Sequence, residues 1–80
     1  MAKVVFPDHL QSYTGGVRDI EVECTDYRGL VKVLNEKWPG IDEVLADTAV
    51  AIDGQIYQDA WLEPIQPSSE VFFMQRIEGG

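Results

Sequence analysis

TDYRGLVKVLNEKWPG, residues 25–40, contains a complete helix signal with a beginning and an end. Thr25 and Asp26 offer side-chain oxygens that cap a helix N-terminus, and Pro39-Gly40 closes the segment. The apolar residues between them recur at the three- and four-residue steps of one helix face: Tyr27, Leu30, Val31, Leu34 and Trp38. Gly29 costs such a helix about 1 kcal/mol relative to Ala, so we expect tertiary packing to hold it. The stretch predicts one amphipathic helix of roughly three turns.

Two strands are predicted on the N-terminal side of this helix. Val4 to Phe6 is β-branched and aromatic and stops at Pro7, which has no N–H for continued pairing. Residues Arg18 to Cys24 alternate between apolar and acidic side chains, which is typical of a half-buried antiparallel strand. Gly15-Gly16 lies between them and can adopt the positive φ angles of a turn. We therefore expect a hairpin with a long loop.

A short helical turn and three strands are predicted on the C-terminal side. Ile41 to Leu45 forms the turn, and the strands Ala49 to Ile52 and Gln55 to Tyr57 flank Asp53-Gly54, a strong signal for a two-residue hairpin. Residues 58–69 contain two prolines and two serines and are interpreted as a crossover loop before a last strand at 71–77. This order predicts an α+β fold, in which one main helix packs on one face of a mixed sheet.

Composition restricts the class of protein. The chain has 80 residues, 14 acidic and 6 basic, with a net charge of −8 and a pI near 4.3. A single domain of this length buries a small core and leaves little room for a closed catalytic pocket. The acidic balance argues against nucleic acid or an anionic membrane as partner and favours a basic protein. One cysteine, no apolar stretch of membrane-spanning length and no signal-peptide core lead us to expect a cytoplasmic protein.

The usual side-chain sets of an active site are not found. His9 stands without a Cys or Ser motif, and Cys24 lies on the apolar face of its predicted strand, as expected for a small buried residue. Asp42, Glu43 and Asp47 lack the spacing of a calcium loop, and the sequence has neither a CxxC pair nor a phosphate-binding glycine loop. We therefore expect that the chain is not an enzyme and binds no metal or cofactor itself.

The pair Gly79-Gly80 at the C-terminus is the most specific feature. Without Cβ atoms, two glycines can extend into a narrow channel of another protein and bring an α-carboxylate to a nucleotide phosphate. Together with the element order, VAIDG at 50–54 and SEVFF at 69–73, this pair resembles the MoaD/ThiS family of ubiquitin-like sulfur carriers, whose fold is the β-grasp. PDHLQSYTGG at 7–16 and PGIDEVL at 39–45 are most similar to the carriers that feed cysteine biosynthesis. We assign residues 1–77 to a β-grasp domain and 78–80 to a flexible diglycine tail.

The resemblance implies a mechanism at this tail. An E1-like adenylating enzyme would use ATP to activate the Gly80 carboxylate, and a sulfur donor would displace AMP to leave a thiocarboxylate, with Gly79 giving the group its reach. A PLP-dependent cysteine synthase would accept the sulfur, and a metal-dependent peptidase would release the product. A molybdopterin synthase large subunit and a thiazole pathway for thiamine are alternative destinations. A ubiquitin-like protein modifier and a plain interaction module stay open as other classes.

A partner-binding surface is expected on the last strand. If Val71 and Phe73 point into the core, alternation directs Phe72 and every second residue after it outward, just before the tail. The alternative is that the crossover loop covers Phe72. The residues assigned to partner binding are Phe72, Met74, Arg76 and Glu78. Arg76 and Glu78 differ from the Pro and small residues common near the tail of molybdopterin-type carriers, which disfavours that branch.

Overall fold

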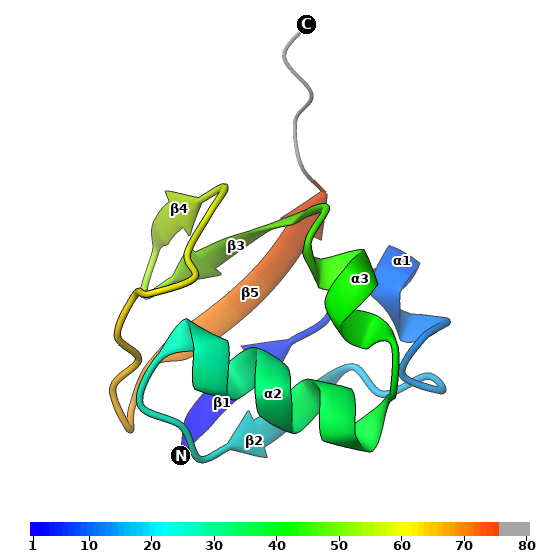
Figure 1. Cartoon of the computed structure of the whole chain (residues 1–80), viewed down its shortest axis with the longest axis horizontal. Helices are drawn as coiled ribbons and strands as arrows, with labels where there is room; N and C mark the ends of the chain where they lie inside the picture. Colours follow the sequence, from blue (N-terminus) through cyan, green and yellow to red (C-terminus); the bar gives the residue numbers. More distant parts are fainter. Residues whose placement is uncertain (76–80) are drawn as a thin grey trace, which may run out of the picture.

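A mixed sheet with a helix laid across it forms the body of the protein (Figure 1). The structure is a computed structural model, and it describes residues 1–75. The strands are β1 (Ala2–Val5), β2 (Asp19–Val22), β3 (Thr48–Ile52), β4 (Gln55–Tyr57) and β5 (Glu70–Gln75). The helices are α1 (Asp8–Gln11), α2 (Tyr27–Lys37) and α3 (Ile41–Leu45).

The strand order is β2-β1-β5-β3-β4, so the last strand lies in the centre of the sheet. It pairs parallel with β1 and antiparallel with β3, and thereby joins the two outer hairpins β1–β2 and β3–β4. The main helix, α2, covers one face of the sheet (Figure 1). This arrangement confirms the predicted α+β class and its β-grasp topology.

Four aromatic rings form a row through the core between α2 and the sheet. Phe6 stacks on Phe73 with ring centroids 5.9 Å apart and an interplanar angle of 8°. Trp38 meets Phe6 edge-on at 5.6 Å, and Tyr27 meets Phe73 edge-on at 6.2 Å. Such pairs contribute about 0.5–1.5 kcal/mol each beyond the area that they bury. The row joins both ends of α2 to β5 and to the residue that follows β1.

The predicted beginning of α2 is confirmed. Asp26 is the N-cap, and its carboxylate accepts a hydrogen bond from the Gly29 N–H at 2.7 Å. The same contact accounts for the glycine, because a Cβ at this position would lie 3.1 Å from the Asp26 Oδ1 and 3.8 Å from the Cys24 Cβ. The close approach of the Asp26 cap therefore explains why glycine, a poor helix former, stands at position 29.

Residues 58–69 connect β4 to β5, as predicted, but they are packed more closely than a solvent-exposed loop. The Ile65 N–H donates to the Thr25 carbonyl at 3.0 Å, and the Glu63 carbonyl accepts from the Tyr27 N–H at 2.9 Å. Ala60 and Ile65 are buried in the core. This connection therefore anchors the beginning of α2.

The predicted hairpin of β1 and β2 is confirmed, but its long connection contains a helical turn that was not predicted. Asp8–Gln11 forms α1, which buries Leu10, and Thr14 is buried as well. The Thr14 hydroxyl donates to the Val17 carbonyl at 2.9 Å. A helix of one turn contains too few positions to show a periodic apolar pattern, so the sequence carried no clear signal for it.

Several predicted boundaries shift by one or two residues, while the turn positions are correct. The first strand begins at Ala2 and ends at Val5, the second covers 19–22 rather than 18–24, and β5 begins at Glu70. Residues 76 and 77 of the predicted last strand lie outside the described residues. Asp53 (φ 51°) and Gly54 (φ 86°) both have positive φ, as a type I′ turn requires.

We predict that Asp26→Ala lowers the free energy of unfolding by about 1 kcal/mol, because the mutation leaves the Gly29 N–H without its cap. Urea denaturation followed by circular dichroism measures this change. The variant Arg28→Ala, which replaces a neighbouring exposed residue, is the control and should change the free energy of unfolding by less than about 0.5 kcal/mol. Equal stabilities of Asp26→Ala and the unsubstituted protein would contradict the capping role.

Candidate functional site

The face of the sheet opposite α2 carries the candidate site. Along β5, Val71 and Phe73 are buried in the core, as predicted. Phe72 points to the opposite face and is 40% exposed, so the 58–69 connection does not cover it. Met74 lies on the same face and is half-buried. The outward direction of both side chains is confirmed, whereas Arg76, Glu78, Gly79 and Gly80 lie outside the described residues.

The sheet register gathers further apolar side chains around Phe72. Directly opposite residues share a face, and Phe72 lies opposite Val5 on one side and Ala51 on the other. Ala51 also lies opposite Ile56, which is 63% exposed. The small Ala51 side chain therefore lies between two large exposed ones. We call this set the open-face patch: Val5, Ala49, Ala51, Ile56, Phe72 and Met74.

Sequence reasoning identified two members of the open-face patch and missed the other four. The outward direction of Phe72 and Met74 follows from alternation within one strand. Ile56 and the two alanines join them only through the pairing of β3 with both β4 and β5. A signal for Ile56 existed in the Asp53-Gly54 hairpin, whose two-residue turn sets Ala51 opposite Ile56.

An acidic flank borders the open-face patch on the β1–β2 side. Asp19 lies opposite Val5, and Lys3 lies between Glu21 on one neighbouring strand and Glu70 on the other. Three carboxylates thus surround a single lysine on this part of the face. An apolar centre with an acidic flank is complementary to a partner with an apolar contact surface and basic residues at its rim.

A hydrogen-bonded clip fixes the beginning of β5 against the β3–β4 turn. The Asp53 carboxylate accepts from the Ser69 hydroxyl at 2.6 Å and from the Glu70 N–H at 3.0 Å, and the Asp53 N–H donates to the Glu70 carbonyl at 2.9 Å. The hydrogen bond from the Ser69 hydroxyl has the larger effect on Asp53, and the bond from the Glu70 N–H the smaller. Together they hold the pKa of Asp53 below its ordinary value. The clip therefore positions the strand that carries Phe72.

The other candidate residues do not form a reactive centre in the described part of the chain. Cys24 is half-buried. Burial has the larger effect and the charge of Asp26 the smaller, and both raise the pKa of the Cys24 thiol. The thiol therefore stays protonated at neutral pH. His9 is exposed on α1. Within residues 1–75, no three His, Cys, Asp or Glu side chains gather closely enough to hold a metal ion. No helix of that part is long and apolar enough to cross a bilayer.

The strand order, the parallel β1–β5 pair and the helix across one face define a ubiquitin-like β-grasp protein. Solved structures share this fold at low sequence identity. A chain in the crystal structure of the Amycolatopsis orientalis BexX/CysO complex superposes with a TM-score of 0.86 and 15% identity, covering 100% of both chains. CysO of Mycobacterium tuberculosis, described as an antigen, gives 0.85 and 16%, covering 96% of this chain and 100% of that one.

A third solved structure has the same fold. The small archaeal modifier protein 1 (SAMP1) of Methanosarcina acetivorans superposes with a TM-score of 0.80 at 15% identity, covering 99% of this chain and 95% of that one. No family model matches the sequence, and no curated protein matches it. The resemblance to ubiquitin-like sulfur carriers is therefore confirmed at the level of the fold.

We predict that the clip makes stability depend on pH below about pH 4. Because the folded-state pKa of Asp53 is lowered, its stabilising effect is fully present above the unfolded-state pKa and is lost as the pH falls through the folded-state pKa. Asp53→Asn should therefore be less stable than the unsubstituted protein at pH 7, and the difference should shrink at pH 3. Asn tolerates the positive φ at this position, so the comparison isolates the carboxylate. Urea denaturation at both pH values measures it, and a difference that is constant with pH would contradict the prediction.

Proposed function

We propose that this protein is a sulfur carrier whose Gly80 carboxylate is converted to a thiocarboxylate, with cysteine biosynthesis as the destination of the sulfur. One observation carries the proposal: a Gly79-Gly80 pair follows the central strand of a fold that superposes on CysO over 96% of this chain and all of the other. The chain is then a protein substrate of its partner enzymes. Residues 1–77 would form the carrier body and 78–80 the tail.

The proposed chemistry takes place at the acyl carbon of Gly80. The carboxylate attacks the α-phosphate of ATP, pyrophosphate leaves, and an acyl-adenylate forms in an E1-like enzyme. A sulfur nucleophile then attacks the acyl carbon, AMP leaves, and the tail ends in a thiocarboxylate. An anionic terminal sulfur is strongly nucleophilic, whereas carboxylate oxygen is a poor nucleophile, so activation creates the reagent. ATP, PLP and the peptidase metal belong to the partners under this proposal.

The open-face patch supplies the docking surface in this proposal. It lies on the strand that leads to the tail, so a partner that covers Phe72 and Met74 is placed beside the path to Gly80. The acidic flank favours basic residues at the rim of the partner. Formation of a complex with another protein has a precedent in the same fold, since the matching chain of Amycolatopsis orientalis belongs to a BexX/CysO complex.

A second candidate function has support from one of the structural neighbours. SAMP1 is named a modifier protein, and a modifier would pass the same Gly80 adenylate to a lysine amine to form an isopeptide bond. The two functions share the activation step and differ in the nucleophile that accepts the acyl group. Conjugates of higher mass in the native cell, lost together with Gly80, would assign the modifier function.

We predict that incubation with ATP, an E1-like adenylating enzyme and a sulfide donor increases the intact mass by the difference between one sulfur and one oxygen atom. Deletion of Gly80 should abolish the change, because the acyl group is then displaced from the adenylating centre. Lys32→Ala, an exposed substitution on α2, is the matched control and should be converted normally. The same increase in the deletion variant, or its absence from the intact chain, would contradict the proposal.

We predict that Phe72→Ser weakens binding to the adenylating enzyme by about tenfold, the effect of truncating one apolar contact near the centre of an interface. Leu62→Ser is the matched control, because Leu62 is 77% exposed but lies in the 58–69 connection, outside the open-face patch. Isothermal titration calorimetry measures both affinities, and circular dichroism verifies that both variants fold. Equal weakening by the two substitutions would show that the open-face patch is not the docking surface.

A further inference from the structure

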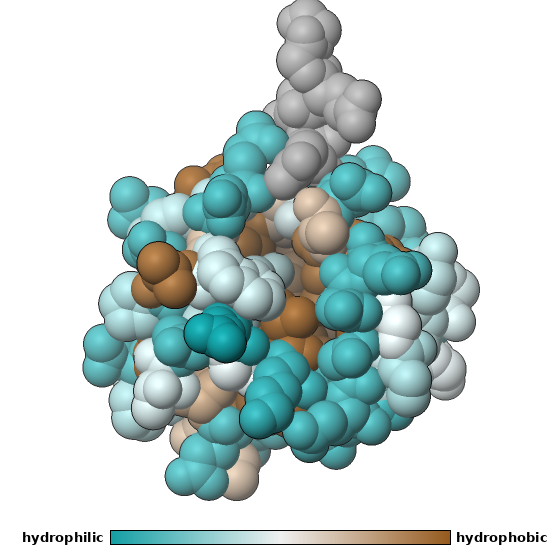
Figure 2. Space-filling view, in the orientation of Figure 1, coloured by the Kyte–Doolittle hydropathy of each residue, from teal (hydrophilic) through white to brown (hydrophobic). Residues whose placement is uncertain are grey.

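A pocket of about 550 Å³ opens on the helix side of the molecule, away from the open-face patch. Figure 2 shows a hollow there with apolar side chains at its bottom and polar ones around it. The wall comes from α2, α3, the beginning of β3 and residues 58–61, with Val31, Leu45 and Val50 among the apolar residues. This volume lies within the range of about 300–1,000 Å³ that is typical of small-molecule sites.

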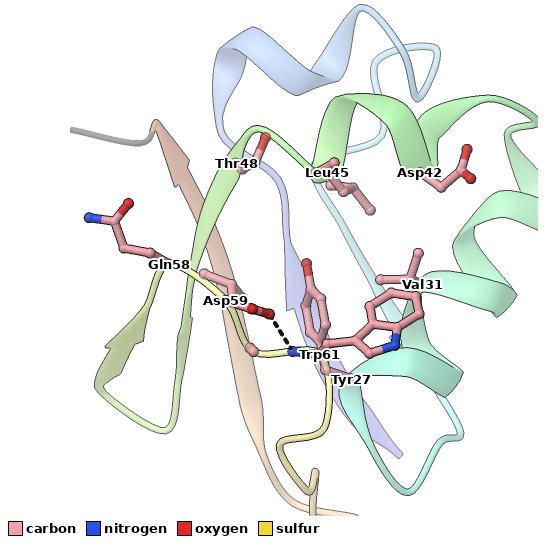
Figure 3. A pocket seen from close by; sticks show the side chains of 11 residues that line it. Tyr27, Val31, Asp42, Leu45, Thr48, Gln58, Asp59 and Trp61 are labelled. Atoms are coloured by element: carbon pink, nitrogen blue, oxygen red, sulfur yellow. Dashed lines mark hydrogen bonds between the residues drawn. The ribbon is translucent and has the colours of Figure 1, made fainter. Parts of the chain in front are cut away.

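Tyr27 places an unused polar group in this pocket. Its side chain is 6% exposed, and its hydroxyl points into the space beside Leu45 and Asp59 (Figure 3). Within residues 1–75 this hydroxyl has no hydrogen-bond partner, although buried polar groups nearly always have one. Burial, reinforced by the charge of Asp59, raises the pKa of Tyr27 to about 12, so the group is a neutral phenol that can both donate and accept.

The Asp59 carboxylate lies beside Tyr27, and the Asp42 carboxylate lies at the far end of the pocket, on α3 (Figure 3). Asp59 comes from the 58–61 segment and Asp42 from the first turn of α3 (Figure 3). The Asp59 Oδ1 accepts from the backbone N–H of Trp61 at 3.2 Å, and Trp61, whose indole extends toward Val31, is 48% exposed (Figure 3). Neither carboxylate has an ion-pair partner in the part of the chain that the structure describes. Arg28 and Lys32 line the adjoining hollow together with Asp42 and Trp61, so Asp59 is the carboxylate that attracts a cation to the Tyr27 end of the pocket.

We propose that this pocket binds an organic cation with an apolar body, such as an arylalkylammonium ion. The apolar body fills the hollow between Val31, Leu45 and the Trp61 ring, the ammonium group lies beside the Asp59 carboxylate, and the Tyr27 oxygen accepts one of its N–H groups. This site does not depend on the proposed sulfur-carrier function, because it lies on the opposite side of the sheet and uses no residue of the tail.

The probe that tests the site is 2-phenylethylammonium, compared with the neutral 2-phenylethanol and the anionic phenylacetate, which have similar shapes. NMR titration monitors the indole N–H signal of Trp61, which Trp61→Phe identifies against that of Trp38. We expect a saturable shift of the Trp61 signal with the ammonium ion, at least about threefold weaker binding of the alcohol, and no saturation with the carboxylate. Equal affinities of the three probes, or no saturable shift with the ammonium ion, would overturn the proposal.

Variants with preserved packing define the contacts. Asp59→Asn and Tyr27→Phe should each weaken binding of 2-phenylethylammonium by about threefold. The Tyr27→Phe variant keeps the ring against Phe73 and removes a hydroxyl that has no protein partner, so its unfolding midpoint should not fall. Glu21→Gln, which removes one acidic charge on the other face of the sheet, is the matched control and should leave the affinity unchanged. Equal weakening by Glu21→Gln would mean general charge attraction and would overturn the site.

A blocked arginine, Nα-acetyl-arginine methylamide, tests whether the bound cation is a basic side chain of another protein or a free aryl amine. Tighter binding of this compound than of 2-phenylethylammonium assigns the pocket to a basic side chain of another protein, and weaker binding assigns it to a free aryl amine. Failure of both compounds to saturate the Trp61 signal overturns the proposal.

Discussion

Phe6, which directly follows β1, stacks on Phe73 of β5, and this contact joins the first and last strands of the sheet. It requires Phe73 to point toward α2, where Trp38 and Tyr27 extend the aromatic row. Because side chains alternate along a strand, the same requirement directs Phe72 to the open face. A slip of one residue in β5 would reverse both faces, so the packing that stabilises the fold also determines the surface offered to a partner.

The two faces of the sheet therefore differ in what they can bind. The open-face patch is apolar, bordered by acidic residues, and placed on the strand that precedes the tail. The covered face adds a pocket beside α2, where Tyr27 contributes its ring to the core and its hydroxyl to the pocket. A small acidic domain can thus offer a protein-docking face and a small-molecule site without a catalytic centre of its own under the functions proposed here.

Local signals in the sequence predicted much of this fold, and contacts between distant segments account for what was missed. The Asp26 cap and the Asp53-Gly54 turn depend on neighbouring residues, so their positions were predicted correctly. The bond between Asp53 and Ser69, 16 residues apart, and the approach of Ile56 to Phe72 across β3 require the sheet register. The pocket was missed as well, because α2, α3 and residues 58–61 all contribute to its wall.

We propose that partners dock on the open face, and methyl NMR of the chain bound to an adenylating enzyme tests this proposal most directly. The methyl groups of Ile56 and Met74 report on the open face, and those of Val31 and Leu45 report on the helix side. We expect the enzyme to shift or broaden the methyl signals of Ile56 and Met74 and to leave those of Val31 and Leu45 unchanged. Perturbation of Val31 and Leu45 with Ile56 and Met74 unchanged would contradict it.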